Sequence, residues 1–443
     1  MRHHKRVVVI LGVAVVGFFT TALTIHWYRT PCPQRAVWSE IAFPPRAPLI
    51  ALQSANAVAQ WTRKYEMPCQ TCHTSFPRLN AYGEKFAKNG YQIPETEDGD
   101  ETKTEVSETT FIDKIGHLFG VRVSVSPVEV TTKSRNVNGS FKPQINFGAA
   151  RWVQFFTAGT IFKNASIFIE TEIPGDASDV AHVNWFTLGY HNLFKTSWLN
   201  LRAGKLSMMN WHAQTGRLRM VPNINVQATN TRSSQGAAAA PATEDTIRFG
   251  SPTPGVELYG YNQYFLYSLG AANGTRFVDN NQYKNFFGTL RLEIPEGAFA
   301  GSAISGWGMW GRDTTNSAAA QVRNTYYAMS GGTNVRWKDR IDFIGAYFMQ
   351  KERNYDMATN ARNTRHNITG QLGYLINERW FAALQYDNVW DSQNSGEEYH
   401  KISQHVSYMP RQNMRIGLTT REELRSRANG RQHELLLNVR AMF

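Results

Sequence analysis

The chain has 443 residues; Tyr, Phe and Trp together make up 12% of them, whereas charged residues make up only 19%. With 34 glycines, this composition excludes a typical helical protein, and after residue 30 no apolar run is long enough to cross a bilayer as a helix. The net charge of +12 at pH 7 would suit a nucleic-acid partner, but the basic residues are scattered, so we expect a solvated polar surface and no nucleic acid.

Residues 1–30 have the pattern of an export signal, in which a basic stretch at 2–6 precedes an apolar stretch at 7–25. The apolar stretch is also long enough to be an uncleaved membrane anchor. Residues 31–59 form an N-terminal extension whose processing the sequence leaves open. Two triplets could precede a cleavage site, at 22–24 and at 57–59. With either site, the rest of the chain is exported.

The clearest motif in the chain is Cys-Gln-Thr-Cys-His at 69–73. This C-x-x-C-H spacing is the attachment signal of a c-type haem, in which the two thiols bind the haem covalently and the histidine ligates the iron. The motif occurs once, so residues 60–94 are predicted to be a monohaem cytochrome c segment that holds one haem c through Cys69, Cys72 and His73. Two alternatives fit less well. A redox-active thiol pair needs a βαβ setting, and a structural zinc site usually needs four ligands, whereas the only other cysteine is Cys32.

The motif does not specify the distal ligand of the iron. We take His117, the first histidine after the motif, as the candidate, although it could equally be a polar residue at the mouth of the first strand. Met67 is too close to the motif in sequence to reach the distal face. Met208, Met209 and His212 are further candidates if they project into a lumen. The choice matters because a Met ligand raises the reduction potential relative to His.

Aromatic residues after the motif are expected to pack rather than to carry electrons. Phe76, Phe86 and Tyr91 are predicted to cover the haem face, because aromatic residues in so small a segment are mainly core. Asn80 and Gly83 are expected to shape a tight turn.

Residues 95–116 are predicted to be an acidic linker. Five acidic residues open it: Glu95, Glu97, Asp98, Asp100 and Glu101. They could attract ferrous cations or a basic partner, but a solvated linker is the simpler interpretation.

From residue 117 to the C-terminus, apolar and polar residues alternate with the period of a strand. The pattern is clear at 199–203, 289–294, 380–387 and 415–419. Each alternating segment has about the ten residues of a tilted membrane strand.

The connections between these strands are alternately short and long. Reading backwards from Phe443, strands are expected at 433–443, 414–421, 400–409, 380–390, 366–375 and 340–350. Short turns are expected at 410–413, 377–378, 338–339, 295–297, 261–262, 195–196 and 163–164. Long loops are expected at 422–432, 391–399, 351–365, 313–322, 272–283, 208–254, 174–181 and 132–143.

We therefore predict an all-β fold for residues 117–443: a transmembrane antiparallel β-barrel of about 16 strands. Short turns at one end and long loops at the other are typical of outer-membrane barrels, and lipid requires the sheet to close because it cannot satisfy an open edge. The last segment agrees, since Leu437, Val439, Ala441 and the terminal Phe443 share one face. A soluble all-β protein is the alternative.

The haem motif also belongs to a longer pattern. Pro-Cys-Gln-Thr-Cys-His at 68–73 is followed by Phe-Pro-Arg-Leu-Asn-Ala-Tyr-Gly-Glu-Lys-Phe-Ala-Lys-Asn-Gly-Tyr at 76–91. This pattern resembles the fused outer-membrane monohaem c-type cytochrome–porins, whose best-known members are the iron oxidases of iron-oxidising bacteria. Ala87 departs from it, since a basic residue is commoner there. The resemblance implies Cys69 and Cys72 as thioether attachments and His73 as the proximal ligand.

These expectations combine into one function. A segment as short as 60–115 can hardly bury a haem alone, so we expect it to fold inside the barrel or against its periplasmic mouth. The resemblance implies an oxidoreductase that is embedded in the lipid of the Gram-negative outer membrane. It would take electrons from extracellular Fe(II) and pass them to a periplasmic c-type cytochrome. The alternatives are a solute channel plugged by the haem segment, and electron export to an extracellular acceptor.

Overall fold

The computed structural model describes the chain from residue 60 onward, with gaps. The described residues are 60–93, 103–107, 110–113, 115–133, 142–162, 164–175, 181–212, 220, 249–273, 283–317, 320–356, 361–392, 398–424 and 432–443. The predicted signal at 1–30, the extension at 31–59 and the acidic run at 95–101 lie outside this part of the chain.

Short elements precede a series of long strands. The first are α2 (Gln60–Tyr65), η1 (Cys69–Thr71), β1 (His73–Ser75), β2 (Arg78–Leu79), α3 (Ala81–Lys88), β3 (Lys103–Ser107), β4 (Thr110–Asp113) and α4 (Ile115–Leu118). The long strands are β5 (Phe119–Lys133), β6 (Lys142–Phe162), β7 (Ala165–Pro174), β8 (His182–Tyr190), β9 (Asn200–Ser207), β10 (Pro252–Tyr261), β11 (Phe265–Asn273), β12 (Lys284–Glu293), β13 (Ala303–Ser317), β14 (Ala320–Trp337), β15 (Ile341–Asp356), β16 (Ala361–Leu375), β17 (Trp380–Asp391), β18 (Tyr399–Arg411), β19 (Met414–Glu423) and β20 (Gln432–Met442). A 3-10 turn, η3 (Leu193–Lys195), lies between β8 and β9. None of the helices in the described part of the chain is both long and apolar enough to cross a bilayer.

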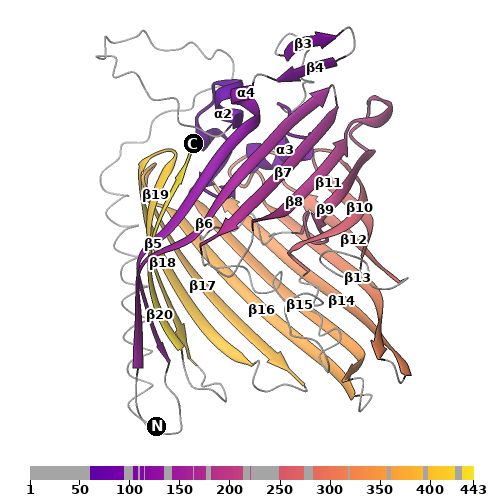
Figure 1. The fold of residues 1–443 in the computed structure, drawn as a ribbon, viewed down its shortest axis with the longest axis vertical. Coiled ribbons are helices and arrows are strands. Elements are labelled where there is room, and N and C mark those ends of the chain that lie inside the picture. The colour runs from indigo at the N-terminus through magenta and orange to yellow at the C-terminus, as the bar shows by residue number, and fades with distance from the viewer. Residues whose placement is uncertain are drawn as a thin grey trace. The chain divides into compact units, whose positions relative to one another are not determined.

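Sixteen of the described strands, β5–β9 and β10–β20, close into one antiparallel barrel (Figure 1). Each strand pairs with its neighbours in chain order, and β20 returns to pair with β5. The last residue takes part in this closure. The amide of Val121 donates to the backbone oxygen of Phe443 at 2.6 Å, and the amide of Phe443 donates to the oxygen of Val121 at 2.8 Å. The prediction of an all-β barrel of about 16 strands is confirmed.

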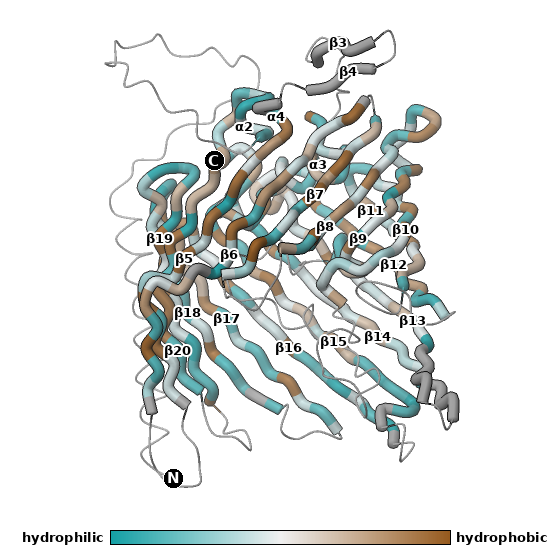
Figure 2. Tube along the Cα trace, in the orientation of Figure 1, coloured by the Kyte–Doolittle hydropathy of each residue, from teal (hydrophilic) through white to brown (hydrophobic). Residues whose placement is uncertain are grey.

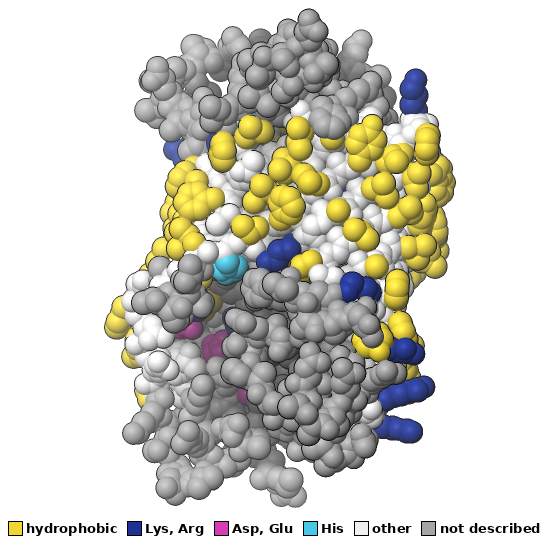
Figure 3. Space-filling view, turned by 45° about the vertical axis from the view of Figure 1, so that its right-hand side comes forward, with side chains coloured by type: hydrophobic (Ala, Val, Ile, Leu, Met, Phe, Trp, Pro, Cys, Tyr) yellow, Lys and Arg dark blue, Asp and Glu magenta, His cyan; other side chains and the backbone are white. Residues whose placement is uncertain are grey.

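The strands carry an apolar outer face and a more polar inner face. In β12, Phe286 and Leu290 are exposed, whereas their neighbours Asn285, Thr289 and Arg291 are buried. Hydrophobic and hydrophilic residues are interspersed along the strands (Figure 2), and hydrophobic side chains gather on the outer surface of the barrel (Figure 3). Aromatic side chains are exposed near both ends of the strands: Trp198, Tyr264, Trp337 and Trp380 at one end, and Phe286, Trp310, Tyr327 and Tyr347 toward the other. Such an apolar band flanked by aromatic girdles suits a membrane.

The predicted short turns at 338–339 and 377–378 are confirmed, because each falls between the strands that the structure has there. The turn predicted at 410–413 begins later than expected, since β18 extends to Arg411 and β19 begins at Met414, and the turn at 163–164 lies between β6 and β7, with residue 163 outside the described residues. Two predicted long loops are wrong. Strands β13 and β14 extend into 313–322, and β15 and β16 extend into 351–365. Polar residues form the extensions, since strand pairing uses backbone hydrogen bonds and does not need an apolar side chain. The alternation of apolar and polar residues stops where the apolar outer face stops, and the paired strand continues beyond that point.

The range predicted as a linker, 95–116, contains a two-stranded antiparallel sheet formed by β3 and β4. The acidic composition of this range favoured the prediction of a linker over these strands. Residue types that favour strands are nevertheless present at Thr104, Val106, Phe111 and Ile112.

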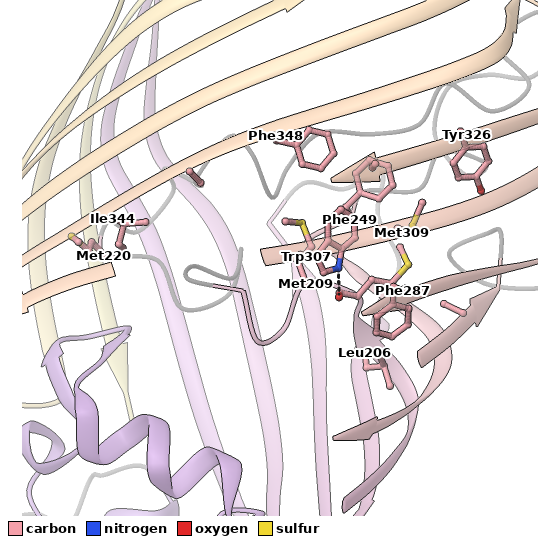
Figure 4. Packing of buried hydrophobic residues seen from close by; sticks show 14 of the residues in the cluster. Leu206, Met209, Met220, Phe249, Phe287, Trp307, Met309, Tyr326, Ile344 and Phe348 are labelled. Atoms are coloured by element: carbon pink, nitrogen blue, oxygen red, sulfur yellow. Dashed lines mark hydrogen bonds between the residues drawn. The ribbon is translucent and has the colours of Figure 1, made fainter. Parts of the chain in front are cut away.

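An apolar cluster lies inside the barrel, around the inward turn that follows β9 (Figure 4). Buried side chains from the walls and from the connection between β9 and β10 form it: Leu206, Met208, Met209, Met220, Phe249, Phe287, Trp307, Met309, Tyr326, Ile344, Phe348 and Phe381. The indole nitrogen of Trp307 donates to the backbone oxygen of Met208 at 2.7 Å. The described residues of this connection, among them Met208, Met209, Met220 and Phe249, therefore pack against the inner wall.

Candidate functional site

The C-x-x-C-H motif forms one tight turn. In η1, the amide of Thr71 donates to the oxygen of Pro68 at 3.0 Å, and the amide of Cys72 donates to that of Cys69 at 3.2 Å. Neither cysteine is in a disulfide. Burial raises the pKa of both thiols, that of Cys72 to about 11, which is the opposite of what a redox-active thiol pair requires.

Helix α3 holds this turn through its first residues. The side-chain amide of Asn80 donates to the backbone oxygens of Gln70 and Thr71 at 3.1 and 3.0 Å, and its oxygen caps the helix by accepting from the amide of Gly83 at 2.9 Å. A side chain at position 83 would meet the backbone of the motif, because a Cβ there would lie 2.2 Å from the oxygen of Cys72. The glycine thus allows the helix to contact the motif.

Gly83→Ala is expected to destabilise residues 60–93 by about 1–3 kcal/mol, because overpacking forces α3 away from Cys72. The midpoint in urea for proteolytic cleavage within this segment measures the change. Lys85→Ala, at an exposed position of the same helix, is the control and should leave the midpoint unchanged. Equal midpoints for Gly83→Ala and the unmodified protein would contradict the proposed contact.

His73 has one ring nitrogen engaged by the backbone. Its Nδ1 lies 3.2 Å from the oxygen of Pro77, and Phe76 packs against the ring with centroids 5.2 Å apart. Burial lowers the pKa of His73 to about 4, so the imidazole is neutral at pH 7. When Nδ1 donates to Pro77, Nε2 carries the lone pair, which is the arrangement found in metal-ligating histidines.

A cavity of about 200 Å³ brings the three motif residues together with the barrel wall. From residues 60–93 it is lined by Cys69, Cys72 and His73, and also by Trp61, Met67, Phe76, Tyr82, Phe86 and Tyr91. From the barrel and its inward turn it is lined by Arg122, Phe156, Phe168, Trp185, Leu206, Trp211 and His212. Most of the lining is aromatic or apolar, as in many cofactor sites, and charged side chains also border the cavity, namely Arg78, Glu84, Lys88, Arg122, Arg202 and Arg291.

The aromatic residues predicted to cover a haem face pack around this cavity. Phe86 contacts the rings of Trp61 and Tyr65 edge-on, with centroids 5.5 and 5.8 Å apart, and Tyr91 stacks on Trp61 at 4.9 Å. Tyr91 also contacts Phe168 of the wall at 5.6 Å. The donor set and this lining fit a c-type haem: two thiols and a neutral imidazole open into one apolar cavity.

Residues 60–93 contact the end of the barrel that carries the short turns and the C-terminus. The amide of Cys69 donates to the side chain of Gln412 at 3.1 Å, and the side chain of Asn192 donates to that of Asn89 at 3.0 Å. Deeper in, the hydroxyl of Tyr259 donates to the backbone oxygen of Lys88 at 2.9 Å.

Buried charges also join this segment to the wall; we call them the docking cluster. They are Arg78, Glu84 and Lys88 of the segment and Arg291, Glu293, Arg336 and Asp342 of the barrel, each with a side chain at most 10% exposed. Arg78 pairs with Asp342 at 2.7 Å, Arg336 pairs with Glu84 at 2.7 Å, and Lys88 pairs with Glu293.

Glu84 is the central carboxylate of the docking cluster. It pairs with Arg291 and Arg336 and lies 3.8 Å from Arg78. Burial alone would raise the pKa of Glu84, but these guanidinium groups outweigh burial and hold it far below its usual value. The cluster could not be predicted from the sequence. A charged residue that alternates with apolar residues in a strand gives the same pattern whether its side chain faces water or lies buried in the lumen.

The distal candidates lie in different places. His117, in α4, does not line the cavity, and neither do Met208 and Met209, which pack in the apolar cluster. Met67 and His212 do line it. The scattered basic charge, which we expected on a solvated surface, is also partly inside, since Arg202, Arg291 and Arg336 are buried in ion pairs.

No protein-family model and no curated protein sequence matches the chain. Solved structures match it over the barrel. An anion-selective porin from Comamonas acidovorans is similar with 11% sequence identity and a TM-score of 0.51, over 73% of this chain and 99% of that one. The outer-membrane channel DcaP of Acinetobacter baumannii shares 12% identity with a TM-score of 0.51 (74% and 96% covered), and Salmonella typhi OmpF in complex with daunomycin shares 11% with 0.50 (79% and 100%). These similarities show a porin-like fold, which suits the outer membrane.

Proposed function

We propose that the protein transfers electrons across the outer membrane as a haem-containing barrel of the cytochrome–porin type. In this function Cys69 and Cys72 bind one haem c covalently, and Nε2 of His73 ligates its iron. The donor is extracellular Fe(II), and the acceptor is a periplasmic c-type cytochrome. The observation that carries the proposal is the cavity of the C-x-x-C-H motif, which has both thiols and the imidazole on its lining within the barrel.

The bound group would supply one-electron chemistry at an iron tuned by its protein ligands. The chain itself supplies attachment, orientation and exclusion of water. Asn80 and Gly83 hold the motif turn against α3, and the carbonyl of Pro77 orients His73. Phe86 and Tyr91 close the cavity toward the segment, and the wall closes it on the barrel side.

A solute channel is the second candidate, and the porin-like fold favours it. Two features of the lumen weigh against a wide open pore. The docking cluster fixes residues 60–93 across the short-turn end, and the apolar cluster lies further inside. A water-filled pore has a polar interior, whereas these walls present Phe287, Trp307 and Phe348 to the connection after β9.

Anaerobic stopped-flow spectroscopy of the purified full-length protein with Fe(II) tests the proposal. We expect Fe(II) to reduce the ferric haem. A haem that dithionite reduces but Fe(II) does not would overturn the iron-oxidase function. Reduction by Fe(II) but transfer only toward extracellular acceptors would favour the export alternative.

Conductance in planar bilayers separates the transfer function from the channel. We expect the intact protein to conduct less than an open porin, because residues 60–93 and the apolar cluster occupy part of the lumen. Porin-like conductance with the haem attached would favour the solute channel.

A further inference from the structure

His212 belongs to the inward turn that follows β9 and lines the same cavity as Cys69, Cys72 and His73. The turn is short and well held. The amide of Met209 donates to the hydroxyl of Ser207 at 3.2 Å, and the amide of His212 donates to the backbone oxygen of Met209 at 3.1 Å. Met209 is buried in the apolar cluster, so the wall fixes the turn that carries His212.

The imidazole of His212 is buried without a hydrogen-bond partner. The residue is 1% exposed, and neither Nδ1 nor Nε2 meets the geometry of a hydrogen bond with a described residue, although the backbone of Ser330 lies close to the ring. Burial and the charge of Arg291 lower the pKa of His212 to about 4, against the backbone of Ser330, which acts to raise it, so the ring is neutral at pH 7. A buried polar group left without a partner lowers stability. A ligand in the cavity would satisfy it.

Other histidines and methionines do not combine these properties; Met442, for example, also lines the cavity but is less buried than His212. His191 is equally buried, but its two nitrogens are 2.6 Å from the hydroxyl of Ser166 and 2.9 Å from that of Tyr259. Met67 lines the cavity, yet its sulfur contacts the hydroxyl of Tyr82 at 3.9 Å and it lies two residues before the motif. Among the histidines that the structure describes, only His73 and His212 line this cavity.

We propose that His212 ligates the same iron as His73, so that the haem has two histidine ligands. This inference rests on the haem binding of the proposed function. It assigns the ligand position to the turn after β9 rather than to His117. A neutral imidazole has the lone pair that iron requires, and iron binding would satisfy one nitrogen of His212. The barrel wall would then supply one ligand and residues 60–93 the other, so that neither part binds the iron fully alone.

Electron paramagnetic resonance and redox titration of the full-length haem protein test the ligand. We expect the unmodified ferric protein to be low-spin and His212→Ala to become high-spin, with the low-spin signal restored by added imidazole. His212→Met should raise the midpoint potential, because a thioether ligand favours the reduced iron more than imidazole does. His433→Ala, at a half-exposed position on β20, is the matched control and should match the unmodified protein.

The outcomes separate this inference from the function on which it rests. A low-spin His212→Ala protein with an unchanged potential would overturn His212 as the ligand while leaving haem binding intact. An unmodified protein without covalent haem would overturn both. Heat-modifiable migration on gels checks that each barrel is folded, and His212→Met, which keeps a long apolar side chain, serves where the alanine variant does not fold.

Discussion

Cys72→Ala is expected to abolish Fe(II)-dependent reduction and to weaken haem attachment, and the Cys69→Ala/Cys72→Ala double variant is expected to lose covalent haem completely. Both thiols line the cavity of the C-x-x-C-H motif, and the motif requires two thioether bonds for normal attachment. Haem staining after denaturing electrophoresis measures attachment, because only a covalently bound haem stays with the chain. Stopped-flow mixing with Fe(II) measures the reaction.

Cys32→Ala is the matched control, since it removes the only other cysteine of the sequence. It should leave haem staining and the rate of reduction unchanged. Haem staining that persists in the double variant would show that the haem is not held by this motif, and the proposed function would then fail at its first step.

Glu84→Gln is expected to lower the free energy with which residues 60–93 dock in the barrel by about 3–5 kcal/mol, because it leaves a buried charge cluster without its central partner. The docking cluster has four cations (Arg78, Lys88, Arg291 and Arg336) and three carboxylates (Glu84, Glu293 and Asp342). Without Glu84, four cations would face two carboxylates. The urea midpoint for proteolytic cleavage within residues 60–93 reports the docking, while the barrel remains resistant.

Glu296→Gln removes the same charge from an exposed position on the turn after β12 and should leave the midpoint unchanged. If Glu84→Gln and Glu296→Gln behaved alike, the docking cluster would not hold the segment.

The same carboxylate gives a pH dependence. The folded-state pKa of Glu84 lies far below that of the unfolded chain, about 4.3, so its contribution is fully present above that value. The contribution declines as the pH falls below that value and is gone below the lower folded value. The difference in urea midpoint between the unmodified protein and Glu84→Gln should therefore be the same at pH 7 and at about pH 5, and cleavage of residues 60–93 in both proteins measures it.

Much of the barrel could be predicted from the sequence. The alternation in β17, β18 and β19 and the short turns between them match the structure within a few residues, because a strand with one face toward lipid must place apolar residues at every second position. The strand at the C-terminus, which ends next to Phe443, could be predicted for the same reason. The ends of β13 and β15 could not be predicted, because beyond the apolar band the side chains no longer alternate in a way that indicates which backbone groups are paired.

The sequence by itself determined the residues of the motif and its immediate supports. Cys69, Cys72 and His73 are close in the chain; where a tight turn was expected, Asn80 instead caps α3 and Gly83 lies within that helix against Cys72. Only the tertiary structure decided what lies opposite them. His212 comes from a connection 139 positions after His73, and Glu84 contacts Arg291 and Arg336 across more than 200 residues. No local pattern encodes such contacts, because only the closing of the barrel brings these residues, far apart in the sequence, into one lumen.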